Sequence, residues 1–181
     1  MIYLFLATGF EECEALAPLD ILRRANIPVK TVGIGAKRII GSHGIEITAD
    51  ICEDEIILDD NLLGIILPGG MPGTINLEKS ITVQEAIDFS AKRNLMISAI
   101  CAAPSILGHK NLLNNKKATC FSGFEAELIG AQVSDSPVVS DGNIITAYGA
   151  GAAFDFGFEI LRYLTNDENS NNLRKQMRYN K

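Results

Sequence analysis

The sequence predicts a single α/β domain built on a mostly parallel sheet with helices on both faces. Short aliphatic segments alternate along the chain with helix-like segments. The aliphatic segments are apolar throughout rather than at every second residue, which is typical of strands buried on both faces. Hydrophobic residues make up 47% of the 181 residues, whereas aromatic residues make up only 7% and tryptophan is absent. An aliphatic core of this kind suits a buried sheet.

The first elements follow from apolar runs and their punctuation. Ile2–Ala7 predicts a buried strand, and Glu11–Ala25 predicts a helix that ends at Asn26-Ile27-Pro28. Val29–Ile34 then predicts a second strand. The next two strands, Lys37–Ile40 and Gly44–Thr48, flank Gly41-Ser42-His43 as in a hairpin.

The central elements lead to the candidate chemistry. Gly64–Leu67 is an apolar strand that stops at Pro68-Gly69-Gly70. Ile81–Arg93 has a helical pattern, and the strand Leu95–Ile100 runs directly into Cys101. The remaining expected elements are a short helix at Ala102–Gly108, a strand at Ala118–Phe121, a short helix at Phe124–Ile129, strands at Val138–Val139 and Asn143–Ala147 around the turn Asp141-Gly142, and a helix at Ala150–Leu164.

The chain has no linker rich in Gly, Pro or Ser, so residues 1–165 are predicted to form one domain. Residues 166–181 are polar and predict a frayed helix or tail. This segment mixes both signs of charge and is expected to be solvated rather than to bind nucleic acid. The charged residues of this segment are Asp167, Glu168, Arg174, Lys175, Arg178 and Lys181.

Composition excludes several classes of protein. The net charge is −6, from 16 basic and 22 acidic residues, which disfavours binding to nucleic acid. The four cysteines form no CxxC pair and only two histidines are present, so neither a disulfide scaffold nor a metal site is expected. No apolar run is long enough to span a membrane and no signal peptide is recognised, so the expected location is the cytoplasm.

Cys101 is the candidate nucleophile because it stands where a buried strand ends and a helix is expected to begin. The N-terminus of a helix offers free N–H groups and partial positive charge, which are expected to lower the pKa of the thiol. The alternative is a buried, inert cysteine. The backbone N–H groups of Gly69, Gly70 and Ala102 are candidates for an oxyanion pocket, although a Pro-Gly-Gly turn is also an ordinary connection.

Glu14 is the candidate acid/base partner. At about 100° per residue, it projects into the apolar arc of the first helix, between Ile21 and Pro18. Burial there would raise the pKa of its carboxyl, which would make it a proton donor and acceptor near a thiolate. Two alternatives stay open: Pro18 makes the angles approximate, and Glu14 is also placed to act as a solvated charge at a helix N-terminus.

The sequence resembles the ThiJ/PfpI superfamily, in the branch of the parkinsonism-associated protein deglycase and its bacterial relatives. The resemblance covers about residues 2–165, and the order and spacing of its landmarks are more specific than any one of them. These landmarks are Gly9-Phe10-Glu11-Glu12-Cys13-Glu14, Pro18-Leu19-Asp20, Arg23-Arg24-Ala25, Ser42-His43-Gly44, Ala49-Asp50, Leu67-Pro68-Gly69-Gly70, Ala99-Ile100-Cys101-Ala102-Ala103-Pro104, Thr146 and Gly149-Ala150-Gly151.

The resemblance implies a flavodoxin-like α/β sandwich, related to class I glutamine amidotransferases, that forms a homodimer. It implies that Cys101 is the reactive cysteine and that Glu14 is the carboxyl group bonded to its sulfur. It implies further residues of the pocket or of the dimer contact, which are Arg24, His43, Cys52 and Cys120.

The histidine pattern departs from that of some relatives. The protease-like branch has a histidine directly after the cysteine, whereas this chain has Ala102. Some deglycase-like members have a histidine after the position of Ala118, but residues 118–142 contain none. His43 can reach a pocket across a dimer, and His109 follows the short helix. The active pair is therefore expected to be Cys101 and Glu14.

The favoured function is a cysteine-dependent glyoxalase or deglycase that acts without a cofactor on methylglyoxal, glyoxal or their adducts. The alternative is a redox sensor or redox-regulated chaperone whose cysteine is oxidised to sulfinic acid. Amide hydrolysis is weaker, because the chain lacks the required histidine and acidic partner. A kinase is also disfavoured, because no GxxxxGK[ST] motif is present.

Overall fold

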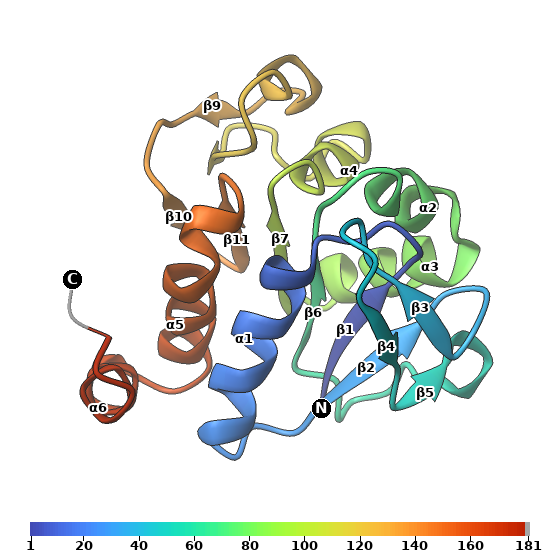
Figure 1. Ribbon diagram of the computed structural model, residues 1–181. Helices are drawn as coiled ribbons and strands as arrows, with labels where there is room; N and C mark the ends of the chain where they lie inside the picture. Colours follow the sequence, from blue (N-terminus) through green and yellow to red (C-terminus); the bar gives the residue numbers. More distant parts are fainter. Residues whose placement is uncertain (180–181) are drawn as a thin grey trace.

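The computed structural model describes residues 1–179. A central sheet lies between two layers of helices (Figure 1). Within the described residues the strands are β1 (Ile2–Leu6), β2 (Val29–Gly33), β3 (Arg38–Ile40), β4 (Glu46–Thr48), β5 (Ile51–Cys52), β6 (Gly64–Leu67), β7 (Met96–Ile100), β8 (Lys117–Ala118), β9 (Gln132–Val133), β10 (Val138–Asp141) and β11 (Ile144–Ala147). The α-helices are α1 (Glu12–Arg24), α2 (Gly73–Lys79), α3 (Ile81–Lys92), α4 (Pro104–His109), α5 (Ala153–Leu164) and α6 (Asp167–Gln176), with 3-10 turns η1 (Glu53–Glu55), η2 (Glu125–Glu127) and η3 (Ala150–Ala152).

The main sheet confirms the predicted mostly parallel architecture. Within residues 1–179 it has seven strands in the order β10-β11-β7-β6-β1-β2-β5. Every neighbouring pair is parallel except β10 and β11, which form a hairpin. Because parallel strands end at the same edge, the ends of β1, β6, β7 and β11 lie close together. The candidate site forms at this edge.

Alternate residues of the central strand enter two cores. On β1, Ile2, Leu4 and Leu6 pack with α1 and α5, whereas Tyr3 and Phe5 pack with α2, α3 and α4. The strand is fully buried, as its continuous apolar sequence predicts. Helices therefore cover both faces of the sheet, as predicted.

The α1–α5 contact depends on an unusual pair of residues. Pro18 lies inside α1 rather than in its first turn. Opposite it, a Cβ placed on Gly157 of α5 would lie 2.9 Å from the Cα of Pro18 and 2.7 Å from Cδ1 of Ile21. Glycine at this position lets the two helices approach closely and holds α1 against the sheet.

Several expected boundaries were wrong. Helix α2 was not expected, and the expected strand at 118–121 is only β8, because the N–H of Phe121 bonds the carbonyl of Cys101 instead of a strand. The expected helix at 124–129 is only the 3-10 turn η2.

The C-terminal segment forms a regular helix up to Gln176. The side chain of Asn166 caps α6 by accepting from the N–H of Asn169 at 2.9 Å, and Leu173 packs into the core beside α5. Tyr179 stacks on Phe154 at 5.6 Å between ring centroids. Lys181, part of the predicted tail, lies outside the described residues. No helix within residues 1–179 has the length and apolar character needed to cross a bilayer.

Candidate active site

Cys101 is presented at the edge of the sheet by a strained turn. It follows β7 directly, and its N–H donates to the carbonyl of Ala147 in β11 at 2.9 Å. Its φ is +65°, in the left-handed region that residues with a side chain rarely adopt. Such strain costs about 1–3 kcal/mol and is concentrated at functional sites. The turn directs the side chain away from the sheet.

Two glycines make room for the sulfur. A Cβ placed on Gly69 would lie 2.6 Å from Cβ of Cys101 and 2.7 Å from Oε2 of Glu14. Gly70 has φ +88°, and a Cβ there would lie 2.4 Å from the backbone nitrogen of Glu11. A side chain at Gly69 would displace Cys101 or Glu14, whereas one at Gly70 would displace the backbone of residues 9–11 just before α1. The N–H groups of Gly70 and Ala102 hydrogen-bond the sulfur.

Glu14 is the buried partner of the thiol. Its residue is 1% exposed, and its Oε2 accepts from the N–H of Gly69 at 2.9 Å. It also hydrogen-bonds the Cys101 sulfur and the backbone N–H of Ala150. Burial, with the charge of Glu11, raises the pKa of Glu14 to about 7, although the hydrogen bonds act in the opposite direction. Both protonation states are therefore populated near neutral pH.

The expected lowering of the thiol pKa was wrong. Burial and the neighbouring Glu14 carboxylate raise the pKa of Cys101 to about 12, and the N–H groups of Gly70 and Ala102 offset only part of this. Helix α4 begins three residues after Cys101, at Pro104, and is only six residues long. A proton on Glu14 removes the repelling charge and turns the carboxyl into a donor to sulfur. The thiolate therefore depends on Glu14 holding the proton.

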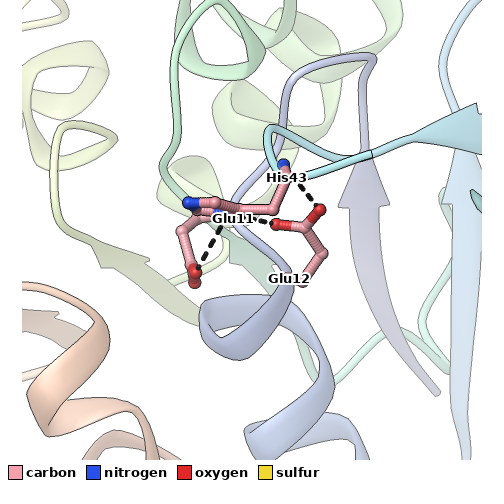
Figure 2. Close-up of side chains that lie close together, drawn as sticks. All are labelled: Glu11, Glu12 and His43. Carbon is pink, nitrogen blue, oxygen red and sulfur yellow. Dashed lines mark hydrogen bonds and ion pairs between the residues drawn. The ribbon is translucent and has the colours of Figure 1, made fainter. Parts of the chain in front are cut away.

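Two further acidic residues organise the start of α1. Glu11 is the N-cap, and its Oε2 accepts from the N–H of Glu14 at 2.8 Å. Glu12 is 4% exposed and accepts from the backbone N–H of His43 at 2.8 Å, while its Oε2 lies 2.9 Å from Nδ1 of the same residue. Figure 2 shows the His43 side chain beside Glu12 at the N-terminal end of the helix. The β3–β4 turn is thus fastened to the helix that positions Glu14.

The hydrogen bonds between Glu12 and His43 also explain the charge states of both side chains. Burial alone would raise the pKa of Glu12, but the side-chain and backbone hydrogen bonds from His43 help to lower it to about 2. The Glu12 carboxylate in turn raises the pKa of His43. Ligand atoms of Glu11, Glu12 and His43 lie within 4.8 Å of one another, a spacing that a metal ion could use. The hydrogen-bonded ion pair already accounts for the geometry, so we assign no metal here.

The other predicted residues lie in different places. Arg24 is ten residues after Glu14 on α1, about 15 Å along the axis, and pairs with Asp20. Cys52 ends β5, where its N–H donates to Glu55 at 2.7 Å. Cys120 is 7% exposed and lines a cavity beside the Cys101 turn.

His109 lies between two carboxylates away from the thiol. Its Nδ1 lies 2.5 Å from Oε1 of Glu78 and its Nε2 lies 2.8 Å from Oε2 of Glu127. The second ring nitrogen is therefore engaged as well as the first. This position gives His109 a structural contact between α2, α4 and η2.

Sequence reasoning missed the roles of Glu11, Glu12 and Phe121. Glutamate is not among the preferred N-cap residues, so Glu11 gave no capping pattern. For Glu12 the sequence offered one signal, the glycine at position 41 in the predicted hairpin turn. In the structure a Cβ on Gly41 would clash with the Glu12 carboxylate, so the buried carboxylate requires glycine there. The contact of Phe121 with Cys101 joins distant segments and had no local pattern.

Comparison with known proteins identifies the family of the chain. Residues 1–163 match the model of the DJ-1/PfpI family. The chain belongs to this family. It is 32% identical over 166 residues to Protein dj-1beta of Drosophila melanogaster, covering 90% of this chain and 88% of the relative. It is 31% identical over 184 residues to the protein named glutathione-independent glyoxalase DJ-1 of Schizosaccharomyces pombe, covering 96% of each.

Solved structures of the family have the same fold. A cysteine-to-alanine mutant of a DJ-1 superfamily protein from Salmonella typhimurium superposes with a TM-score of 0.92 at 30% identity, covering 99% of this chain and 98% of the other. The DJ-1 structure from Schizosaccharomyces pombe gives a TM-score of 0.88 at 31% identity, with 97% of each chain covered. The flavodoxin-like α/β fold is therefore confirmed.

Proposed function

We propose that this DJ-1/PfpI protein is a cofactor-independent glyoxalase or deglycase that converts small reactive carbonyl compounds through Cys101 and Glu14. The observation that carries the proposal is the shared hydrogen bond between the Glu14 carboxyl and the Cys101 sulfur, with the Gly70 and Ala102 amides around it. Family membership, which includes a relative named as a glyoxalase, supports it.

The reaction begins when the Cys101 thiolate attacks the aldehyde carbon of methylglyoxal and forms a C–S bond. The former carbonyl oxygen takes a proton and gives a hemithioacetal. Backbone N–H groups stabilise the negative oxygen as it forms. This step needs no electron acceptor, because the addition of a thiol to a carbonyl group is not a net oxidation.

Glu14 then moves a proton between neighbouring carbons. As carboxylate it removes the proton from the carbon that bears sulfur, and as carboxylic acid it returns a proton to the adjacent carbon. The product is a thioester of lactate, so one carbon is oxidised while its neighbour is reduced. Water hydrolyses the thioester, releasing lactate and the thiol. A pKa of about 7 suits Glu14 to both directions of transfer.

The test is lactate formation from methylglyoxal without glutathione. Cys101→Ala should abolish it, and Glu14→Gln should lower kcat about a hundredfold, the usual scale of a lost acid/base group. The matched control is Cys13→Ala, which removes an exposed thiol and should retain the rate. An unchanged rate in Cys101→Ala would exclude the mechanism.

Redox sensing is the second candidate, because the same donors that surround sulfur would hold an oxidised cysteine. Peroxide would convert the Cys101 thiolate to sulfenate and then sulfinate, releasing one water at each oxidation. Protonated Glu14 would donate to a sulfinate oxygen. Mass spectrometry after mild peroxide treatment should then find two added oxygen atoms on the Cys101 peptide before any other cysteine peptide. Equal oxidation of the exposed Cys13 would contradict selective sensing.

The dimer and the cytoplasmic location stay predictions.

A further inference from the structure

The cavity that Cys120 lines lies beside the Cys101 turn. It has a volume of about 300 Å³ and is walled by residues of the segments 119–125 and 133–135 and by Tyr148. The strand β9, labelled in the yellow to orange part of the chain in Figure 1, contributes Val133 to this wall. The N–H of Phe121 donates to the carbonyl of Cys101 at 2.8 Å, so one wall of the cavity continues the wall of the thiol site.

The aromatic wall also reaches the acid/base group. A Cβ placed on Gly149 would lie 3.2 Å from Cδ2 of Phe121 and 3.9 Å from Oε1 of Glu14. Because residue 149 is glycine, no side chain at this position lies between the Phe121 ring and the Glu14 carboxyl.

The cavity carries negative charge without compensation. Glu125 and Asp135 line it, and none of its lining residues is basic. In the part of the chain that the structure describes, neither carboxylate has an Arg, Lys or His within ion-pair distance. The charge of Glu125 reaches the buried thiol beneath it, because it contributes with burial to raising the pKa of Cys120 to about 11.

The aromatic residues are open to a ligand. Phe121 is 50% exposed and Tyr148 is 39% exposed, so part of each ring is accessible. A planar guanidinium group stacks on such rings and donates paired N–H groups to carboxylates. A phosphate or carboxylate would be repelled by Glu125 and Asp135.

We propose that this cavity is a subsite for an alkylguanidinium group, held by Glu125 and Asp135 and stacked against Phe121 or Tyr148. The subsite binds the cation whether or not turnover occurs. Its effect on substrate choice rests on the proposed function: carbonyl compounds that carry a guanidinium group are favoured over carbonyl compounds that carry a carboxylate or phosphate.

Binding is tested with methylguanidinium and its neutral counterpart methylurea, by NMR titration of the intact protein. Methylguanidinium should perturb the amides of 119–125 and methylurea should not. Glu125→Gln with Asp135→Asn should weaken binding about tenfold, because exposed ion pairs are individually weak. The Gln side chain keeps an oxygen for the N–H of Gly123, which Glu125 accepts at 2.8 Å, so the loop retains its fold.

The matched control is Glu85→Gln with Glu168→Gln, which removes the same charge from exposed positions on α3 and α6. The control should bind methylguanidinium like the wild type. An equal loss in the control, or equal binding of methylurea, would overturn the proposal. A short peptide with one arginine, compared with its citrulline counterpart, distinguishes a protein side chain from a free small molecule as the source of the group.

A second measurement does not require enzymatic turnover. Cationic and anionic methanethiosulfonates each transfer a thioalkyl group to a thiolate and release a sulfinate, and mass spectrometry gives the rate at each cysteine. At Cys101 the ratio of cationic to anionic rates should fall several-fold in the Glu125→Gln, Asp135→Asn variant. It should stay unchanged in the control. A ratio that is equal in both variants and the wild type would contradict a cation subsite next to the nucleophile, even if lactate formation succeeds.

Discussion

At the scale of single residues, the candidate active site pairs the buried carboxyl of Glu14 with the half-buried thiol of Cys101. Glu14 carries the proton when Cys101 is a thiolate, and the thiol carries it when Glu14 is a carboxylate. The two arrangements have the same net charge, so burial penalises neither by an additional charge. The surrounding N–H groups favour whichever partner is negative.

Glu14→Gln should change how stability depends on pH. The folded state raises the pKa of Glu14 from 4.5 to about 7, so the folded protein holds this proton more tightly than the unfolded chain. The stabilisation is complete below pH 4.5 and is lost as pH rises toward 7. Glutamine does not titrate. The free energy of unfolding of the variant, relative to that of the wild type, should therefore rise between pH 5 and pH 8 by up to about 3 kcal/mol.

Urea unfolding at the two pH values measures this difference. The matched control is Glu85→Gln on the exposed side of α3, which should show no comparable gain between the two pH values. A parallel pH dependence for wild type and Glu14→Gln would mean that the Glu14 carboxyl ionises as freely in the fold as in water.

The sequence was informative about residues whose role follows from local pattern. Glu14 was placed correctly because helical spacing put it on the apolar arc, and Cys101 because it ends an apolar strand. The direction of the thiol pKa was wrong because burial and the neighbouring Glu14 carboxylate raise it, and both are set by tertiary packing. The Glu12–His43 pair escaped prediction for the same reason, since its partners are 31 residues apart.

At the scale of elements, the α1–α5 contact determines where Glu14 sits. Gly157→Ala should destabilise the protein although alanine favours a helix by about 1 kcal/mol over glycine. The new Cβ would lie 2.9 Å from the backbone of Pro18, which cannot move without shifting α1. Overpacking of this kind costs about 1–3 kcal/mol. Urea unfolding of Gly157→Ala should therefore show a net loss of stability.

A second glycine provides the control for this substitution. A Cβ on Gly151 would lie 3.9 Å from the Tyr148 ring, an ordinary contact. Gly151→Ala should leave stability within about 0.5 kcal/mol of the wild type. If Gly157→Ala were equally neutral, the close approach of α1 and α5 would not depend on glycine.

His109 connects three elements through charge. Its neighbours Glu78 and Glu127 raise its pKa through hydrogen bonds, so its stabilisation is full below the unfolded value of 6.5 and is lost as pH rises through the folded pKa. His109→Ala should lower the melting temperature more at pH 6 than at pH 9. The effect should stay below about 1 kcal/mol, because the ring is partly exposed and water screens the pairs.

A double-mutant cycle separates this charge effect from packing. In a Glu78→Gln, Glu127→Gln background, His109→Ala should lower the melting temperature by the same amount at pH 6 and at pH 9. A pH dependence that survived in that background would assign the effect to another titrating group.

Element prediction succeeded where apolar runs are long and failed where structure is set by contacts across the chain. Strands β1, β6 and β7 of the main sheet were recognised because burial on both faces makes them continuously apolar, whereas the two-residue edge strand β5 was missed. Helix α2 begins at Gly73 directly after the Met71-Pro72 pair, and no favoured N-cap residue precedes it. The segment 118–121 resembles a strand in composition, but its backbone serves the Cys101 turn.

At the scale of the whole molecule, the negative charge is part of the chemistry. The net charge is −6, and Glu125 and Asp135 place two of the negative charges at the cavity beside the Cys101 turn. Fold class followed from composition and pattern, but this local field did not, because the two carboxylates come from separate loops.

The homodimer implied by the family resemblance is tested at this scale. Ile40 and Ile45 flank the turn of the β3–β4 hairpin and are 49% and 51% exposed, although the same turn is fastened to α1 by Glu12. A rigid, partly apolar hairpin is suited to a contact between two copies, because little order has to be imposed on association. Sedimentation equilibrium should give twice the chain mass of 19.6 kDa. Ile40→Lys with Ile45→Lys should shift the mass toward a single chain, whereas Ile81→Lys, on a residue 75% exposed at the start of α3, should not. A wild-type mass of one chain at micromolar concentration would refute the dimer, and an unshifted dimer in the hairpin variant would place the contact on another face.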